Sequence, residues 1–362
     1  MRKSKRGPSL DSDIEIVHIS HHRDSVRTGC VATERLLPFQ VPRRGTCMTA
    51  GPAPSAQRYL SNHGHQAEVL IPIIDESVVF NHAPSMIHWS WPRAHWTKEV
   101  LGAMLPFTRV VTSATRPSHV CRRYYPIGSH GGARSWLRTR QTADLMRRAM
   151  AKHCGLRDWA GADDGTRRRQ ERVVVLLRGD SQQVNVSNAS SPAPERRAFA
   201  HLPDVMRWLR AALPTASVQV ETTRAHAPIC TQARWVHGAA AVLSPHGAHL
   251  LNALWMPRGA ALLEVMPWAM WDYEGYSALF KAAELRHAKI RAARPPPTDA
   301  HWTTANGRQE HSQRRCAMTE GCRMFYRGQS RLHFGLHDVC RALRGRLPSV
   351  DHPSSACARS RA

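Results

Sequence analysis

The segment Ser244-Pro245-His246-Gly247-Ala248 combines residue types that suit the binding of an anion. It follows the apolar run Ala240–Leu243, which predicts a strand. Ligands gather at the carboxyl ends of strands in a parallel sheet, and Gly247 would let the backbone approach one closely. A helix that begins near Ala248 would add free N–H groups, and His246 a side chain that donates or carries charge. The pattern predicts a site for a diphosphate; the alternative is a plain strand-to-helix turn with a buried histidine.

Two further side chains stand where predicted strands end. Arg178 follows the apolar run Val173–Leu177 and could hold a diphosphate by charge-assisted hydrogen bonds. Glu264 lies in the run Ala261–Met266, and a carboxylate that only accepts hydrogen bonds suits a ribose diol. The alternatives are a surface arginine at a strand end and a structural salt bridge. We expect Asn252 to brace the turn rather than to contact a ligand.

These residues need a sheet to position them. From Val173 onward, short apolar runs alternate with helical stripes, which predicts βαβ units and a parallel sheet covered on both faces. The predicted strands are Val173–Leu177, Val218–Val220, Ala240–Leu243 and Ala261–Met266, and the predicted helices are Leu202–Leu213 and Ile229–Val236, the second ending at Gly238.

The N-terminal half is less regular. The apolar runs Glu68–Ile74 and Ser77–Phe80 predict strands, as does Arg109–Thr112. Leucines and methionines recur at helical spacing in Trp136–His153, and Gly155 would end that helix.

From Val242 to Pro267 the sequence resembles the signature of glycosyltransferase family 61. The features that carry the resemblance are a His-Gly-Ala turn, the later Pro257-Arg258-Gly259-Ala260, and the strand-borne Glu264 before a proline. The similarity covers Val173–Leu285 well and the N-terminal half weakly. It implies an α/β, GT-B-like fold of two Rossmann-like domains that face a cleft, with the donor held mainly by the C-terminal domain. It also implies inverting transfer of a sugar from a UDP-sugar to a hydroxyl of a glycan or glycoprotein.

The same resemblance places the catalytic base in the N-terminal domain. The family shows an Asn and a His there, followed shortly by a carboxylate, and this chain has Phe80-Asn81-His82 and then Met86–Trp91 without an acid. Either His88 or His82 is therefore the candidate base, or the chain is impaired in catalysis; a structural role is the alternative for each. No metal cluster with ligand spacing is present, so cationic side chains and helix N–H groups would stabilise the departing diphosphate, without a cofactor.

Composition and patterning divide the chain into segments. We expect a disordered or loosely attached segment at 1–65, an acceptor-side domain at 66–165 and a nucleotide-sugar-binding domain at 166–290. These are followed by a loop or insertion at 291–329, a closing helix at 330–348 and a disordered tail at 349–362.

Nine cysteines occur without a C-x-x-C pair, so no zinc ribbon is predicted. The odd number leaves at least one thiol free or paired with another chain. Cys316 and Cys322 could form a disulfide in an oxidising compartment, but spacing alone does not establish it.

The formal charge of +24 suggests a polyanion partner, but the arginines are spread along the chain. We therefore predict no specific nucleic-acid partner and keep a polyanion-binding protein as an alternative, beside an inactive family homologue that binds nucleotide-sugar or glycan. No run of about 18 apolar residues predicts a transmembrane helix, and no apolar segment follows the basic N-terminus. The family implies the Golgi or endoplasmic reticulum lumen and a membrane anchor, which is not seen. The sequons at Asn185 and Asn188 weakly support that location.

Overall fold

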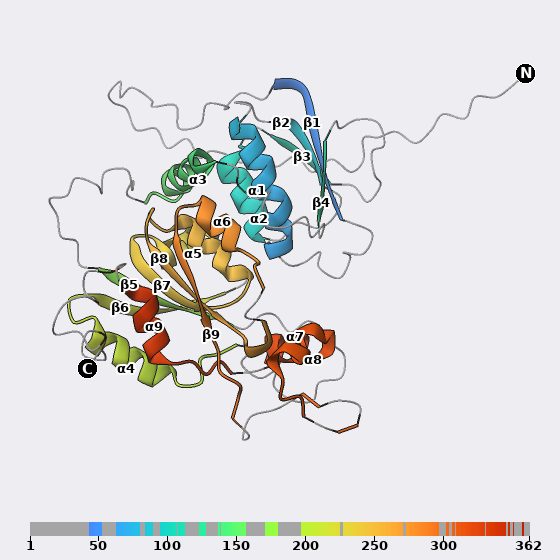
Figure 1. Ribbon diagram of the computed structural model, residues 1–362. Coiled ribbons are helices and arrows are strands. Elements are labelled where there is room, and N and C mark those ends of the chain that lie inside the picture. Colours follow the sequence, from blue (N-terminus) through green and yellow to red (C-terminus); the bar gives the residue numbers. More distant parts are fainter. Residues whose placement is uncertain are drawn as a thin grey trace, which may run out of the picture. The chain divides into compact units, whose positions relative to one another are not determined.

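The computed structural model divides into two compact units, residues 1–145 and 146–362, and each is described by itself (Figure 1). The described residues are 43–52, 63–79, 84–89, 95–106, 108–112, 123–127, 137, 139–156, 171–179, 197–224, 227–270, 273–296, 302–303, 306–307, 309–329, 331–344, 347, 350 and 357.

The first unit contains a four-stranded sheet in which all strand pairs are parallel. Its order is β3-β2-β1-β4, with β1 at Arg43–Pro52, β2 at Pro84–Trp89, β3 at Arg109–Thr112 and β4 at Arg123–Ile127. Helices α1 (His63–Val79) and α2 (His95–Met104) connect β1 to β2 and β2 to β3, as crossovers between parallel strands require. The next helix, α3 (Arg140–His153), contains the boundary between the units.

Two strands predicted in this unit are wrong. Glu68–Ile74 and Ser77–Val79 lie in α1, and Phe80 lies outside the described residues. A continuous apolar run does not distinguish a buried strand from a buried helix, and α1 buries Leu70, Ile71, Ile73 and Ile74 together. Strand β3 confirms the prediction at Arg109–Thr112. The expectation that residues 1–65 are disordered is wrong for Arg43–Pro52, which form β1. The sequence of β1 does not show a strand pattern, but its hydrogen bonds to β2 and β4 hold it in the sheet.

The second unit contains a five-stranded parallel sheet with the order β6-β5-β7-β8-β9. The strands are β5 (Arg172–Arg178), β6 (Ser217–Thr223), β7 (Ala239–Pro245), β8 (Ala261–Met266) and β9 (Arg286–Arg291). The first four confirm the predicted strands, whereas β9 was not predicted because its sequence is mostly polar and charged.

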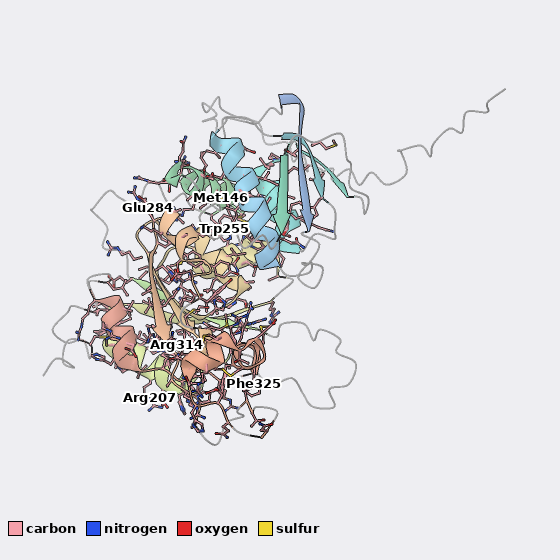
Figure 2. All side chains as sticks on the ribbon, turned by 45° about the vertical axis from the view of Figure 1, so that its right-hand side comes forward. Met146, Arg207, Trp255, Glu284, Arg314 and Phe325 are labelled. Atoms are coloured by element: carbon pink, nitrogen blue, oxygen red, sulfur yellow. A yellow bond between two sulfur atoms is a disulfide. The ribbon has the colours of Figure 1, made fainter. Side chains whose placement is uncertain are left out.

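Helices cover both faces of this sheet (Figure 1). Helices α4 (Leu202–Ala212) and α9 (Leu336–Leu343) share one apolar core with alternate residues of β5, β7 and β8. Helices α5 (Ile229–Val236) and α6 (Ser277–Ala282) pack on the other face, together with the 3₁₀ helix η3 (Ala248–Trp255). Figure 2 shows this contrast of core and surface, with Trp255 of η3 in the interior and Arg207 of α4 at the outside. Helix α5 is followed by Gly238 at φ 70°, which confirms the predicted stop.

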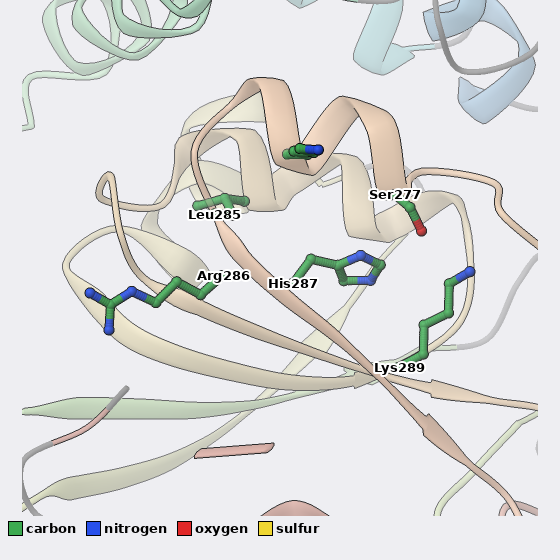
Figure 3. Close-up of a pocket in the computed structure, with 6 residues that line it drawn as sticks. Ser277, Leu285, Arg286, His287 and Lys289 are labelled. Carbon is green, nitrogen blue, oxygen red and sulfur yellow. The ribbon is translucent and has the colours of Figure 1, made fainter. Parts of the chain in front are cut away.

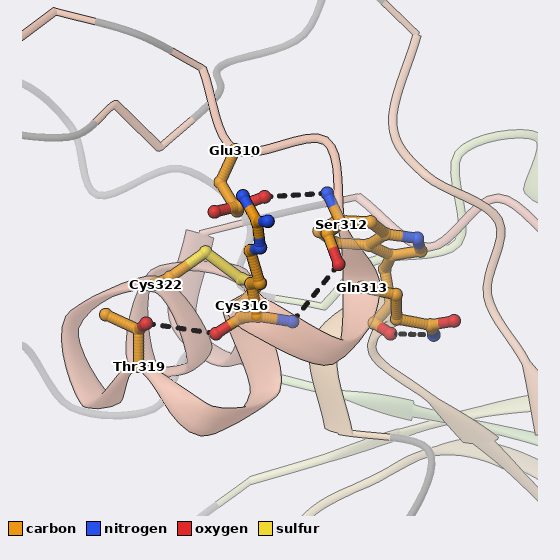
Figure 4. The surroundings of a disulfide bond; sticks show 8 residues. Glu310, Ser312, Gln313, Cys316, Thr319 and Cys322 are labelled. Carbon is orange, nitrogen blue, oxygen red and sulfur yellow. Dashed lines mark hydrogen bonds between the residues drawn. A yellow bond between two sulfur atoms is a disulfide. The ribbon is translucent and has the colours of Figure 1, made fainter.

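Helices occupy part of the segment expected to be a loop or insertion at 291–329. They are α7 (Gln313–Met318) and α8 (Glu320–Gln329), and a disulfide between Cys316 and Cys322 joins them (Figure 4). Ser312 caps α7 by accepting a hydrogen bond from the Arg315 backbone N–H. Tyr326 and both cysteines are buried against Trp268 of η4 (Trp268–Met270). A short polar segment of this kind folds because the disulfide and the contact with η4 offset its small core.

Two described residues of the C-terminal tail expected to be disordered at 349–362, Val350 and Cys357, are buried in the second unit. Cys357 is buried and forms a disulfide with Cys340 of α9, and Val350 belongs to the same core. The predicted closing helix is present but shorter, since α9 spans Leu336–Leu343 rather than 330–348. Leu332 instead forms a bridge with Phe199. No helix among the described residues is long and apolar enough to cross a bilayer.

Candidate functional site

The order of strands in the second unit creates a point where the chain changes direction across the sheet. The chain runs from β5 to β6 on one side and then returns to place β7 on the other side of β5. In such doubly wound sheets, ligands bind in the crevice at the carboxyl ends of the two strands where the order reverses. Here these ends belong to β5 and β7.

The predicted anion-binding residues lie at this edge. Arg178 is the last residue of β5, and β7 ends at Pro245, directly before His246 and Gly247. Val175 pairs with Leu243, so Arg178 and His246 each stand three residues beyond a paired position. Two segments more than 60 residues apart in sequence therefore meet at one edge, as the parallel arrangement predicted.

A hydrogen-bonded His–Glu–His cluster forms behind this edge. Nδ1 of His246 lies 2.6 Å from Oε1 of Glu264, and Nε2 of His287 lies 2.8 Å from Oε2 of the same carboxylate. His246 is 3% exposed and Glu264 only 1% exposed. His287 comes from β9, and sequence reasoning did not identify it as a site residue, because nothing in the sequence pairs a histidine on one strand with a glutamate on the strand before it.

Burial and hydrogen bonding decide the charges in this cluster. Burial alone would raise the pKa of Glu264, but the hydrogen bonds from His246 and His287 lower it to about 2. Burial lowers the pKa of His246, against the opposing effect of Glu264, and the charges of Arg197 and Arg327 lower it further. At neutral pH an ionised Glu264 therefore accepts hydrogen bonds from both imidazoles, and His246 is neutral with its proton on Nδ1.

Arg197 is a second residue that the sequence did not indicate. Its Nη1 donates a 2.5 Å hydrogen bond to the carbonyl oxygen of His246, and its side chain is largely buried. Its backbone has φ 62°, a left-handed conformation that costs a non-glycine residue about 1–2 kcal/mol. A buried guanidinium in a strained backbone conformation thus fixes the carbonyl of the turn. No sequence pattern distinguishes it from the neighbouring arginines.

Gly247 is required by space rather than by its backbone angle. Its φ of 167° is extended and open to any residue. A Cβ atom built there would lie 2.8 Å from Nδ1 of His249 and 3.2 Å from Nη1 of Arg197. The turn is therefore closed around a missing side chain by contacts within the protein; close approach to a ligand stays a prediction.

The other polar residues of the turn are bonded inward. Ser244 Oγ lies 2.7 Å from the carbonyl oxygen of Leu176 and 2.8 Å from Nε2 of His249. Asn252 donates to Oε1 of Gln232 at 3.0 Å, which connects η3 to α5 and agrees with the predicted bracing role. Ala248 begins η3, so the helix expected at this residue is present as a 3₁₀ helix.

Several predicted residues remain apart from this cluster. His88 lies in β2 of the first unit, where its backbone pairs with Thr49 and Val111. His82 and the sequons at Asn185 and Asn188 lie outside the described residues. Within the described part of the chain, no group of three or more His, Cys, Asp or Glu side chains is arranged to hold a metal ion.

Comparison with known proteins gives a family match over part of the chain. The family model described as "Glycosyltransferase 61" matches residues 94–263. This region includes Arg178 and the Ser244–Ala248 turn, and it ends one residue before Glu264. No curated protein matches the chain in sequence.

Among solved structures, the chain is similar to the iron-containing heptosyltransferase TibC, whose crystal structure contains ADP-D-β-D-heptose. The identity is 10%, and the alignment covers 63% of this chain and 60% of that chain. The TM-score is 0.28, which is too low for the likeness to carry an argument.

Proposed function

We propose that this chain is an inverting glycosyltransferase of family 61 that moves a sugar from a UDP-sugar to a hydroxyl of a glycan or protein. The match of residues 94–263 to the family model supports the proposal. The observation that carries the proposal is the meeting of Arg178 with the His246–Gly247 turn at the point where the strand order reverses. This edge of a doubly wound sheet is where nucleotide ligands are expected.

Arg178 supports binding of the donor's diphosphate. A guanidinium gives charge-assisted, bidentate hydrogen bonds to phosphate oxygens, which are stronger than bonds between neutral groups. Beside it, Gly247 lets the turn pack closely against His249 and Arg197, where a side chain would clash. The same positive charge would stabilise the diphosphate as it leaves.

His246 is assigned a different role from the one that its residue type first suggested. Because its Nδ1 proton is directed to Glu264, the neutral ring presents Nε2 as a hydrogen-bond acceptor. An acceptor suits a hydroxyl or N–H group of the donor and does not suit a phosphate oxygen. Glu264, buried with each oxygen already bonded to an imidazole, is better suited to positioning His246 than to contacting ribose directly.

Transfer with inversion requires one displacement at the anomeric carbon. The acceptor oxygen forms the new bond to this carbon while its proton passes to a general base, and the bond to the diphosphate oxygen breaks with its electron pair. We assign the base to His88 or His82 of the first unit. Both units are built on parallel sheets, which supports a GT-B arrangement with the acceptor on the first unit and the donor on the second.

The disulfides support a location in the Golgi or endoplasmic reticulum lumen. Three of them occur among the described residues, at Cys154–Cys230, Cys316–Cys322 and Cys340–Cys357. Disulfides form and persist in oxidising compartments and are rare in the cytosol. Lumenal glycan or glycoprotein acceptors are consistent with this location.

A thermal-shift titration with UDP and a series of UDP-sugars tests the proposal. A ligand at 100 times its Kd stabilises the native state by about 2.7 kcal/mol, so binding raises Tm in a concentration-dependent way. We expect Arg178→Gln and His246→Ala to weaken the UDP-dependent shift. Arg207→Gln removes one cation from the opposite face and should leave the shift unchanged. Absence of a shift with every nucleotide at millimolar concentration would exclude the donor assignment.

The absence of an acid at the expected place in Phe80–Trp91 favours one second candidate, an inactive homologue that binds nucleotide-sugar without transferring it. Product analysis with radiolabelled UDP-sugar and mixed glycan acceptors separates the two. UDP binding without labelled product or released UDP would identify the inactive homologue. Labelled product that is lost in His88→Ala or His82→Ala would identify the enzyme and its base.

A further inference from the structure

A hollow of about 590 Å³ lies over β9 and α6, outside the crevice at the ends of β5 and β7 (Figure 3). This volume is in the range of small-molecule sites. Six residues line it: Ser277, Lys281, Leu285, Arg286, His287 and Lys289. None of the site residues predicted from sequence belongs to this group.

The lining is rich in hydrogen-bond donors and contains no carboxylate. Lys281 is exposed on α6, and Lys289 donates to the carbonyl oxygen of Tyr273 at 2.7 Å. Lys289 also forms an ion pair with Glu274, with 3.6 Å between Nζ and Oε2. The side chain of Glu274 is 82% exposed. Figure 3 shows the Ser277 hydroxyl, the His287 ring and the Lys289 chain on one side of β9, with Arg286 directed away from His287. Two ammonium groups and a hydroxyl suit an oxyanion.

His287 connects the hollow to the buried cluster. Its Nε2 is bonded to Oε2 of Glu264, and its ring packs edge-on against Phe280 with centroids 5.2 Å apart. These contacts fix the orientation of the ring and direct its Nε2 proton to Glu264, so His287 shapes the hollow and does not donate to an anion in it.

The strand order separates the hollow from the proposed donor crevice, because β8 lies between β9 and β7. Along the strand direction the hollow reaches the level of the Ser244–Ala248 turn, since Lys289 pairs with Glu264 and Glu264 with Ser244. The donor crevice lies at the carboxyl ends of β5 and β7. Two strand spacings, about 10 Å, separate β9 from β7.

We propose that this hollow is a second ligand site, which binds a phosphate- or sulfate-type oxyanion carried by a molecule other than the nucleotide donor. Lys281 and Lys289 supply the charge, and Ser277 supplies a hydroxyl that can donate to the anion. The rival source of the same chemistry is the diphosphate of the donor itself. The site does not depend on the transferase activity, because its lining does not include Arg178 or His246.

Calorimetric titration with inorganic phosphate at constant ionic strength tests the site. We expect wild type to bind phosphate, Lys281→Gln to bind it several-fold more weakly, and Lys281→Gln/Lys289→Gln to bind it at least about tenfold more weakly, since each loses a charge-assisted bond. The matched control is Arg207→Gln/Arg210→Gln, which removes two exposed cations from α4 on the opposite face. Melting curves of both double variants establish that they are folded.

A second arm repeats the phosphate titration in saturating UDP. An unchanged Kd for phosphate supports a separate site. Mutual exclusion of UDP and phosphate overturns the proposal and assigns the hollow to the donor's diphosphate. No phosphate binding to wild type at about 10 mM, or equal loss in the two double variants, also overturns it. If UDP fails to bind at all, the donor assignment fails, while the first titration still decides the oxyanion site.

Discussion

His246 and Glu264 are joined across neighbouring strands by a 2.6 Å hydrogen bond between Nδ1 and Oε1, because His246 follows β7 and Glu264 lies in β8. The parallel register pairs Ser244 with Glu264. His246, two residues after Ser244, therefore lies within reach of the Glu264 carboxylate. The pair is buried, and His287 bonds to the other carboxylate oxygen. Its protonation therefore affects both the stability of the unit and the orientation of the candidate donor site.

Acid should destabilise the protein through this cluster in two pH ranges. The folded pKa of Glu264 is lowered from 4.5 to about 2, so its contribution is complete above pH 4.5 and is lost as pH falls towards 2. By linkage this contribution is on the order of 3 kcal/mol. The folded pKa of His246 is lowered from 6.5, so below pH 6.5 the unfolded state takes up a proton that the folded state refuses, and stability declines.

Urea unfolding of wild type and Glu264→Gln between pH 8 and pH 3 measures this effect. We expect the variant to be less stable at pH 7, and the difference between the two to shrink as the pH falls. Glu274→Gln, which alters an exposed carboxylate, is the control and should follow wild type. A difference that stays constant with pH would contradict the assignment of an ionised Glu264.

Gly247→Ala should disturb the turn through steric contact alone. The new Cβ would meet His249 and Arg197, whose side chains are held by their own hydrogen bonds. We expect a loss of about 1–3 kcal/mol in stability, typical of an overpacked buried site, and weaker binding of UDP.

The matched control is Gly328→Ala in α8, where a Cβ meets nothing within 4 Å. This substitution should be neutral or stabilise by about 0.5–1 kcal/mol, as alanine favours a helix. Equal effects of the two substitutions would show that the turn has room for a side chain.

Ser244→Ala should lower stability more than it changes binding. The hydroxyl bonds inward to the Leu176 carbonyl and to His249, and removing it leaves buried polar groups without their partner. The expected cost is about 1–3 kcal/mol. Ser217→Ala is the control, since its hydroxyl accepts only an exposed bond from Gln219. A selective loss of UDP affinity at unchanged stability would instead indicate that Ser244 contacts the donor.

Removing the disulfides singly, by changing both cysteines to alanine, should give a ranked loss of stability. The sequence separations are 76 for Cys154–Cys230, 17 for Cys340–Cys357 and 6 for Cys316–Cys322. Loop-closure entropy predicts contributions of about 4.5, 3 and 2 kcal/mol in that order. Unfolding under non-reducing conditions, with free thiols counted by mass spectrometry, measures the ranking. A reversed order would mean that local contacts outweigh loop closure.

Most elements of the second unit were predictable from sequence because their signals are local. The run Val173–Leu177 and the stripe of Leu202–Leu213 each carry one clear periodicity, and the sheet built from them is parallel. The first unit was predicted less well. Residues 69–74 form a continuous apolar run that fits a buried helix as well as a buried strand, so only burial in the folded unit distinguished the two.

The sequence by itself determined the turn Ser244–Ala248, its place after a strand, and the positions of Arg178 and Glu264 at or near strand ends. Only the tertiary structure decided that Glu264 bonds to His246 and His287, that Arg197 holds the carbonyl of the turn, and that Cys357 joins α9. These contacts join residues 17 to 49 positions apart. Such pairings depend on strand order and register, which local periodicity does not encode, since periodicity reports which face a residue takes and not which strand lies beside it.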